Sequence, residues 1–340
     1  MDMNGKLNIA LIGAGGMGKR WANGLRHARG VAVRVVCDKD MRCAEKVGKQ
    51  FHNCRFEMDI NKVAKADDID IAIIALPHVL LSRASLLFLK NGKHVLCEKP
   101  GGIAQKEIKQ AIKEARKNNV HYAVGYNHRF HDAFLKARKE FEKGTVGRLM
   151  FIRARYGFGG RKGYEKEWRL NKKAGGGELM DQCVHMIDLC SLFMGSIQTT
   201  RGFTGNLFWH GTAEDNAFLL LKNKTGNIAS IHASYSEWRP AHTFEIYGTK
   251  GYLVVDGLGR KYKGSNGGNE RLIVGKRTTD FKANEKIIAC DTSANKSLTR
   301  EIESFISGIK GKKTPIATGE EAFRVLHNVQ TIYAQNKNKK

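Results

Sequence analysis

A glycine-rich segment near the start of the chain has the spacing of a phosphate-binding turn. Residues 13–18 read GAGGMG, the pattern GxGxxG, between an apolar run at 8–12 and helix-forming residues at 16–27. In such a turn the first glycine permits a tight bend and the second lets the backbone approach a pyrophosphate. The third allows close packing of a helix whose unpaired N–H groups face the anion. The segment therefore predicts a dinucleotide-binding turn formed by Gly13, Gly15, Gly16, Met17 and Gly18.

An acidic residue follows the next predicted strand, at 31–37. Asp38 lies 20 residues past Gly18, where a carboxylate can accept hydrogen bonds from the adenosine ribose of a dinucleotide. Because a carboxylate also repels a 2′-phosphate, we expect NAD as the cofactor. Lys39 and Arg42 lie close in the sequence and keep NADP as an alternative. A structural turn followed by a surface aspartate is the other interpretation of these residues.

A lysine stands at the end of a later predicted strand, at 94–97. In the sequence Glu98-Lys99-Pro100, Lys99 would lie at the carboxyl edge of the sheet, where the nicotinamide is expected. A lysine there can donate a hydrogen bond to a substrate hydroxyl and, if desolvated, move a proton. A surface lysine before a turn proline explains the same residues, so spacing alone leaves both interpretations open.

A histidine and two carboxylates follow three consecutive glycines at 175–177. Asp181 and His185 are spaced i, i+4 and share one face of a helix predicted at 178–194, with Asp188 three residues further on. A histidine beside carboxylates can act as a general acid or base near neutral pH. A structural hydrogen bond between the two side chains is the alternative. No third ligand at suitable spacing accompanies them, so we expect no metal site.

The elements that must position these residues divide the chain in two. In residues 1–125, strands alternate with helices, which is typical of a doubly wound parallel sheet with helices on both faces. In residues 126–340, helices accompany alternating strands, for example at 218–221, 227–234 and 243–247, which favours a mostly antiparallel sheet covered on one face. We therefore expect an α/β protein: an N-terminal dinucleotide-binding domain at 1–125 and a C-terminal α+β domain at 126–340.

The composition narrows the class of protein. The 58 Lys and Arg against 33 Asp and Glu give a net charge of +25, which a nucleic-acid binder would also show. The charges are spread along the chain and no helix-turn-helix or zinc pattern accompanies them, so we expect no nucleic-acid partner. Basic residues are denser in the segment 148–173, which contains nine of them. This segment is either a solvated loop or a funnel for an anionic substrate.

Membrane association is not expected. The longest apolar stretches, such as 71–76, are far shorter than the roughly 20 residues that a spanning helix needs. The glycine-rich residues 9–17 do not resemble a signal peptide. Seven cysteines without a CxxC pair are expected to be reduced thiols, and we expect a cytoplasmic protein.

Five short motifs occur in order over most of the chain. They are GAGGMG at 13–18, GKHVLCEKP at 92–100, GYNHRF at 125–130, GTVGRL at 144–149 and GGGELMDQCVHMIDL at 175–189. Together they resemble the glucose-fructose oxidoreductase / inositol dehydrogenase (Gfo/Idh/MocA) family of NAD(P)-dependent sugar dehydrogenases. The resemblance implies a Rossmann domain followed by a substrate-binding domain whose sheet face forms a homo-oligomer, either a dimer or a tetramer.

The resemblance also implies a reaction and roles for particular residues. A substrate C–H would deliver hydride to the nicotinamide while the hydroxyl proton passes to a histidine or lysine. It makes His185 the principal acid/base, Lys99 the group that polarises the reacting oxygen, and Asp181 a residue that orients the substrate. The cofactor-binding set then also includes Lys39, Pro77, Glu98, Lys99 and Asn127, and the substrate-binding set adds Arg129, Arg155, Trp168 and Arg169 to the three catalytic residues.

The expected substrate is a small molecule with a secondary hydroxyl: a sugar, polyol or nucleotide-sugar, with the basic segment favouring an anionic one. The motifs depart from the family pattern at Cys183 and Leu81, where it commonly has glycine and histidine, and these changes concern the shape of the pocket. A non-catalytic dinucleotide-binding sensor on the same fold is the alternative. The presence of both Lys99 and His185 favours the enzyme.

Overall fold

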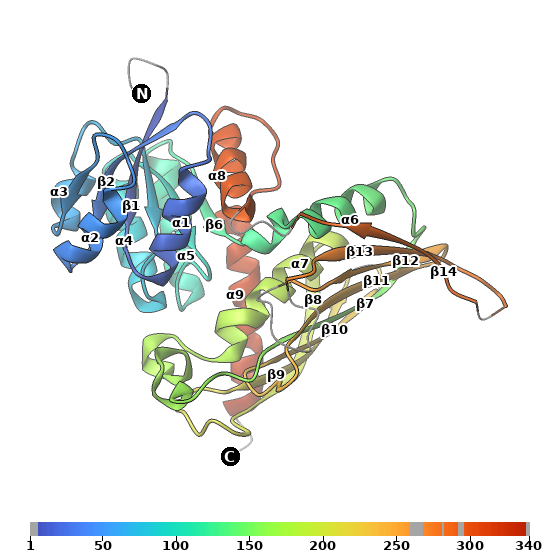
Figure 1. The fold of residues 1–340 in the computed structure, drawn as a ribbon. Helices are drawn as coiled ribbons and strands as arrows, with labels where there is room; N and C mark the ends of the chain where they lie inside the picture. The colour runs from blue at the N-terminus through green and yellow to red at the C-terminus, as the bar shows by residue number, and fades with distance from the viewer. Residues whose placement is uncertain (1–5, 259–267, 281, 292–295, 338–340) are drawn as a thin grey trace. The chain divides into compact units, whose positions relative to one another are not determined.

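The computed structural model describes residues 6–258, 268–280, 282–291 and 296–337. They form two compact units (Figure 1), and each is described by itself. The first takes in Met1–Phe130 and Ala294–Leu326, and the second takes in His131–Ser293 and His327–Lys340. The described helices include none with the length and apolar composition needed to cross a bilayer.

The first unit is built on a six-stranded parallel sheet. Its strands are β1 (Leu7–Ile12), β2 (Val31–Cys37), β3 (Arg55–Glu57), β4 (Ile71–Ile74), β5 (His94–Glu98) and β6 (Tyr122–Gly125). They lie in the order β3-β2-β1-β4-β5-β6, so the order reverses between β1 and β4. Both of those strands are buried along their whole length because the sheet is covered on two faces. The predicted doubly wound parallel sheet is confirmed.

Helices cover this sheet. They are α1 (Gly16–Leu25), α2 (Met41–Gly48), α3 (Ile60–Ala64), α4 (His78–Lys90), α5 (Gln105–Lys117) and α8 (Lys296–Ile309), with a short 3-10 turn η1 at Asn127–Phe130. The late helix α8 belongs here because Leu298, Ile302 and Phe305 join the core formed by β1 and α1. Packing therefore places 296–326 in the first unit, whereas the sequence predicts a single boundary, between 125 and 126.

The second unit holds an eight-stranded sheet. Its strands are β7 (Leu149–Gly157), β8 (Ile197–Gly205), β9 (Asn216–Asn223), β10 (Ile228–Ser234), β11 (Ala241–Gly248), β12 (Gly251–Asp256), β13 (Arg271–Lys276) and β14 (Asn284–Ala289). They lie in the order β14-β13-β12-β11-β7-β10-β9-β8, and every neighbouring pair is antiparallel except β7 with β10. The mostly antiparallel sheet predicted for this region is confirmed.

Helices pack against one face of this sheet, and its strands alternate buried and exposed side chains accordingly. The α6 helix (Asp132–Glu142) contacts β12 and β13, and α7 (Val184–Met194) contacts β7 and β10. The final helix α9 (Gly319–Lys337) bonds to β8 through its last turns: Gln335 donates to the carbonyl of Thr200, and Asn336 to that of Gly202. Residues 257–269, whose content of Gly, Lys and Asn predicts a loop, lie largely outside the described residues.

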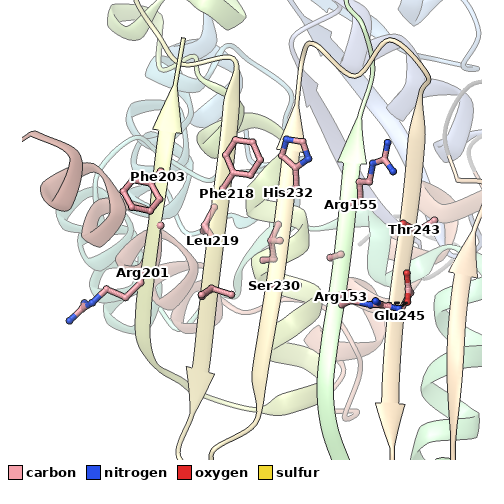
Figure 2. A pocket seen from close by; sticks show the side chains of 14 residues that line it. Arg153, Arg155, Arg201, Phe203, Phe218, Leu219, Ser230, His232, Thr243 and Glu245 are labelled. Carbon is pink, nitrogen blue, oxygen red and sulfur yellow. Dashed lines mark hydrogen bonds and ion pairs between the residues drawn. The ribbon is translucent and has the colours of Figure 1, made fainter. Parts of the chain in front are cut away.

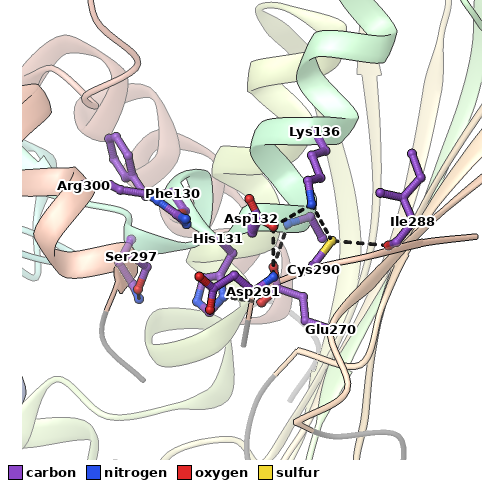
Figure 3. Close-up of polar contacts among 12 residues, drawn as sticks. Phe130, His131, Asp132, Lys136, Glu270, Ile288, Cys290, Asp291, Ser297 and Arg300 are labelled. Carbon is purple, nitrogen blue, oxygen red and sulfur yellow. Dashed lines mark hydrogen bonds and ion pairs between the residues drawn. The ribbon is translucent and has the colours of Figure 1, made fainter. Parts of the chain in front are cut away.

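A distant carboxylate caps the start of α6 (Figure 3). Glu270 accepts a hydrogen bond from the backbone N–H of Ala133 at 2.6 Å, and its other oxygen lies 2.9 Å from Nδ1 of His131. Asp132 accepts from the backbone N–H of Asp291 at 2.9 Å. These contacts join α6 to the segments at the ends of β13 and β14, and a negative group at a helix N-terminus is favourable.

Candidate active site

The glycine turn between β1 and α1 has the packing that the motif predicts. Gly13 has a φ of +99°, and a Cβ on it would lie 2.4 Å from the carbonyl oxygen of Ala75. A Cβ on Gly18 would lie 1.9 Å from the carbonyl oxygen of Gly13. Gly15 and Gly16, in contrast, have no atom within 4 Å of a built Cβ. Two glycines thus hold the turn closed, while two keep open the space beside the N-terminus of α1 that an anion would approach.

Asp38 lies at the carboxyl end of β2, beside that turn. Its carboxylate accepts hydrogen bonds from the backbone N–H of Ala14 at 2.7 Å and of Asp40 at 3.0 Å, which fix its orientation. Lys39 follows directly. Arg42, which kept NADP as an alternative, has its Nε 3.3 Å from the carboxylate of Asp40. The carboxylate next to the glycine turn is therefore Asp38, and the nearby arginine is engaged elsewhere.

The Glu-Lys-Pro motif lies at the end of β5. Glu98 is buried and accepts a hydrogen bond of 2.6 Å from the indole N–H of Trp21 in α1. Burial raises the pKa of Glu98 above its ordinary value. This bond ties the end of β5 to the helix that follows the glycine turn, and Lys99 is partly exposed at the next position.

The strand order brings several predicted residues to one edge of the sheet. Because β2, β1, β4 and β5 are adjacent and parallel, their carboxyl ends lie side by side. These ends carry, in that order, Asp38, the glycine turn, Pro77 and Lys99. Asn127 follows β6 in η1 and lies 3.3 Å from the hydroxyl of Ser297. A crevice at the point where strand order reverses is where doubly wound sheets bind dinucleotides.

In the second unit, Asp181 lies in a π-helical segment, Leu179–Cys183, that leads into α7. The helix predicted at 178–194 is present, and the π-helical turn is a local feature of its start. Oδ2 of Asp181 accepts from Nε of Arg169 at 3.0 Å and from the hydroxyl of Tyr235 at 2.7 Å. His185 is buried one turn further on. The guanidinium of Arg169 also lies 4.8 Å from the ring centroid of Trp168.

The structure therefore brings Trp168, Arg169 and Asp181 together. Arg155 lies elsewhere in the same unit, on the exposed face of the sheet, where it pairs with Glu237. Arg129, in the first unit, is buried and donates to the carbonyl of Pro315 at 3.0 Å and to Glu321 at 3.2 Å. Its guanidinium thus binds Pro315, which precedes α9, and Glu321 in the first turn of α9.

Two residues near Asp181 were missed by the sequence analysis. Besides Tyr235, the carboxylate of Glu214 accepts from the backbone N–H of Leu179 at 3.2 Å and from the hydroxyl of Tyr333 at 2.8 Å. A Cβ on Gly177 would lie 2.4 Å from Glu214 Oε1. Burial raises the pKa of Glu214 to about 7. Neither residue stands in a motif, so only the folded structure reveals them.

No group of three or more His, Cys, Asp or Glu side chains suited to a metal occurs in the described ranges. All seven cysteines are free thiols. The candidate residues thus form two groups: those at the carboxyl edge of the parallel sheet in the first unit, and the cluster around Asp181 in the second.

A doubly wound dinucleotide-binding unit, joined to a unit built on a mostly antiparallel sheet with helices on one face, is the architecture of an NAD(P)-dependent oxidoreductase. Residues 7–126 match the family described as "Oxidoreductase family, NAD-binding Rossmann fold", and residues 134–254 match "GFO/IDH/MocA C-terminal domain". The chain belongs to the Gfo/Idh/MocA family of oxidoreductases. The resemblance drawn from the five motifs is confirmed.

Relatives of known activity are distant. The 2,7-anhydro-N-acetylneuraminate hydratase of Escherichia coli (strain K12) is 25% identical over 322 residues, which cover 91% of this chain and 82% of that protein. Levoglucosan dehydrogenase of Pseudarthrobacter phenanthrenivorans is 26% identical over 292 residues, covering 74% of this chain and 73% of that one. The solved complex of levoglucosan dehydrogenase with NADH and levoglucosan superposes with a TM-score of 0.85 at 19% identity, over 98% of both chains, which shows a shared fold.

Proposed function

We propose that the protein is an NAD-dependent dehydrogenase that moves hydride between the nicotinamide and a secondary hydroxyl of a sugar, polyol or nucleotide-sugar. The observation that carries this proposal is the edge of the parallel sheet, where adjacent strands end in Asp38, the glycine turn and Lys99. The names of the dehydrogenases among the relatives support the class of substrate. The alternative is a dinucleotide-binding sensor without turnover.

The residues present fit a dinucleotide. The open space over Gly15 and Gly16 admits a pyrophosphate, and the N–H groups that begin α1 face it. Asp38 would hold the ribose hydroxyls, with Lys39, Pro77, Glu98 and Asn127 completing the set. When bound, NAD supplies the hydride acceptor. Because a carboxylate at Asp38 repels a 2′-phosphate, NAD is preferred to NADP.

Two side chains perform the proposed acid–base work, and a third orients the substrate. Lys99 donates a hydrogen bond to the reacting oxygen and polarises it. His185 accepts the hydroxyl proton during oxidation and returns it during reduction. Asp181 orients the substrate, with Trp168 and Arg169 beside it. The substrate-binding roles expected of Arg129 and Arg155 rest on the resemblance alone, because their guanidinium groups pair with Glu321 and Glu237.

The preference for an anionic substrate comes from the basic segment 148–173. Four of its nine basic residues are engaged in ion pairs, namely Arg153, Arg155, Arg161 and Arg169. Their charge is largely compensated within the protein. The anionic preference therefore depends on the lysines of the segment, such as Lys172 and Lys173, both of them exposed.

Formation of reduced nicotinamide tests the function directly. NAD and NADP are compared against inositols, neutral sugars, sugar acids and nucleotide-sugars, with absorbance of the reduced cofactor as the readout. We expect turnover with NAD, weaker turnover with NADP, and a substrate carrying a secondary hydroxyl. Absence of turnover in every combination, from a protein that binds NADH, would favour the sensor instead.

We also propose a homo-oligomer, a dimer or tetramer, built through the open face of the eight-stranded sheet. This face carries exposed apolar side chains, among them Phe203 and Leu220, around a depression of about 610 Å³ (Figure 2). Charged pairs such as Arg153 with Glu245 flank it, and a large exposed apolar surface of this kind marks an interface. A cytoplasmic location and the absence of a nucleic-acid partner stay predictions.

Sedimentation velocity tests the oligomer. The double variant F203E/L220E is expected to lower the mass from that of an oligomer to that of one chain, because two carboxylates would be buried in the interface. Met58→Glu, an exposed position in the first unit, is the matched control and should leave the mass unchanged. A wild-type protein that sediments as a monomer contradicts the proposal.

A further inference from the structure

The tyrosine that follows β10 is held by both its backbone and its ring. The backbone N–H of Tyr235 donates to the carbonyl of Asp215 at 2.8 Å, and its own carbonyl accepts from the indole N–H of Trp209 at 2.8 Å. The ring meets those of Phe158 and Tyr164 edge to face, with centroids 5.6 and 5.2 Å apart. The side chain is fully buried. These contacts restrict its hydroxyl to one place.

That hydroxyl donates a hydrogen bond to Asp181. The bond from Tyr235 to Oδ2 is 2.7 Å long, and Arg169 donates to the same oxygen at 3.0 Å. The side chain of Arg169 is one-third exposed and is shared with Glu167 at 3.3 Å. Burial first, and then the charge of Asp181, raises the pKa of Tyr235 well above its ordinary value. The phenol therefore keeps its proton, and Tyr235 is the fixed, neutral donor.

A second buried tyrosine offers an internal comparison. Tyr164 packs against Tyr235 and is equally buried. Its hydroxyl has no hydrogen-bond partner among the residues that the structure describes. Replacing Tyr164 by phenylalanine removes one oxygen from the same aromatic cluster without removing a bond to Asp181. Comparing the Tyr235 and Tyr164 variants therefore separates the effect of losing the hydrogen bond to Asp181 from the effect of altering the aromatic cluster.

We propose that Tyr235 is a positioning residue: its hydroxyl holds the carboxylate of Asp181 in the orientation that Asp181 needs to orient the substrate. The inference rests on the proposed function, since it concerns the reaction assigned to Asp181. Tyr235 does not itself touch the substrate. It acts from the core of the second unit, where its fixed hydroxyl donates to the same carboxylate oxygen as the partly solvated Arg169.

Four proteins test this: Y235F, Y164F, D181N and the double variant Y235F/D181N. We expect Y235F to lower kcat about tenfold, which is the loss of one hydrogen bond to a charged group, with NADH affinity unchanged. Y164F should keep kcat within about twofold of wild type. Adding Y235F to D181N should cause no further loss, because the two residues act as one unit.

Two results overturn the proposal: a Y235F variant with the kcat of wild type, or losses from Y235F and D181N that multiply in the double variant. Lack of turnover by the wild-type protein would instead contradict the proposed function. In that case the same cycle, extended by the double variant Y164F/D181N, is measured by urea unfolding. Coupling between Tyr235 and Asp181, absent for Tyr164 and Asp181, supports the positioning role, and additive losses overturn it.

Discussion

Replacing Gly18 with alanine is expected to destabilise the protein by about 2 to 3 kcal/mol and to weaken NADH binding. The added Cβ would lie 1.9 Å from the carbonyl oxygen of Gly13, a backbone atom that cannot move without opening the turn. Alanine's better helix propensity, worth about 1 kcal/mol, does not offset such a clash. Urea unfolding measures the stability, and fluorescence titration with NADH measures the binding.

The matched control is Gly15→Ala, three residues earlier in the same motif. No atom lies within 4 Å of its built Cβ, and its φ of −71° suits alanine. Stability should therefore change by less than about 0.5 kcal/mol. NADH binding should still weaken, about tenfold or more, because the methyl group occupies the space that a pyrophosphate approaches. If Gly15→Ala bound NADH like wild type, the proposed place of the pyrophosphate would be wrong.

The contrast between these glycines shows what a motif can predict. GxGxxG with flanking apolar and helical segments predicts the turn because the strand, turn and helix are consecutive in the chain. The same is true of Asp38 and Lys99, which end two predicted strands. Their position at one edge of the sheet follows from the rule that the carboxyl ends of parallel strands share an edge. Local sequence patterns and this one topological rule therefore suffice to predict the candidate residues of the first unit.

Other features depend on contacts between distant segments, which local patterns do not report. The apolar face of α8 is visible in the sequence, but its partner is α1, more than 270 residues earlier, as the bond from Thr299 to the carbonyl of Gly24 shows. Strand β14 escaped prediction because nearly all its side chains are exposed, so no apolar alternation marks it. Tyr235 and Glu214 reach the Asp181 segment only through the fold.

Replacing His185 with alanine is expected to lower kcat by a factor of about 10² to 10⁴, the usual contribution of a general acid/base. NADH affinity should stay near that of wild type, because Gly13, Gly18 and Asp38 all belong to the first unit, whereas His185 belongs to the second. Steady-state kinetics on the substrate identified in the panel measures kcat, and the fluorescence titration measures NADH affinity.

Because His185 is buried, its removal leaves a cavity, and loss of fold must be separated from loss of chemistry. His185→Gln keeps most of the volume without a group that titrates near neutral pH, so it should lose kcat to a similar degree with smaller loss of stability. His327→Ala, at an exposed position in α9, removes an imidazole elsewhere and should keep full turnover. A His185→Gln variant that is folded, binds NADH and turns over like wild type would refute the acid/base role. Lys99 would then be the remaining proposed group able to accept the proton.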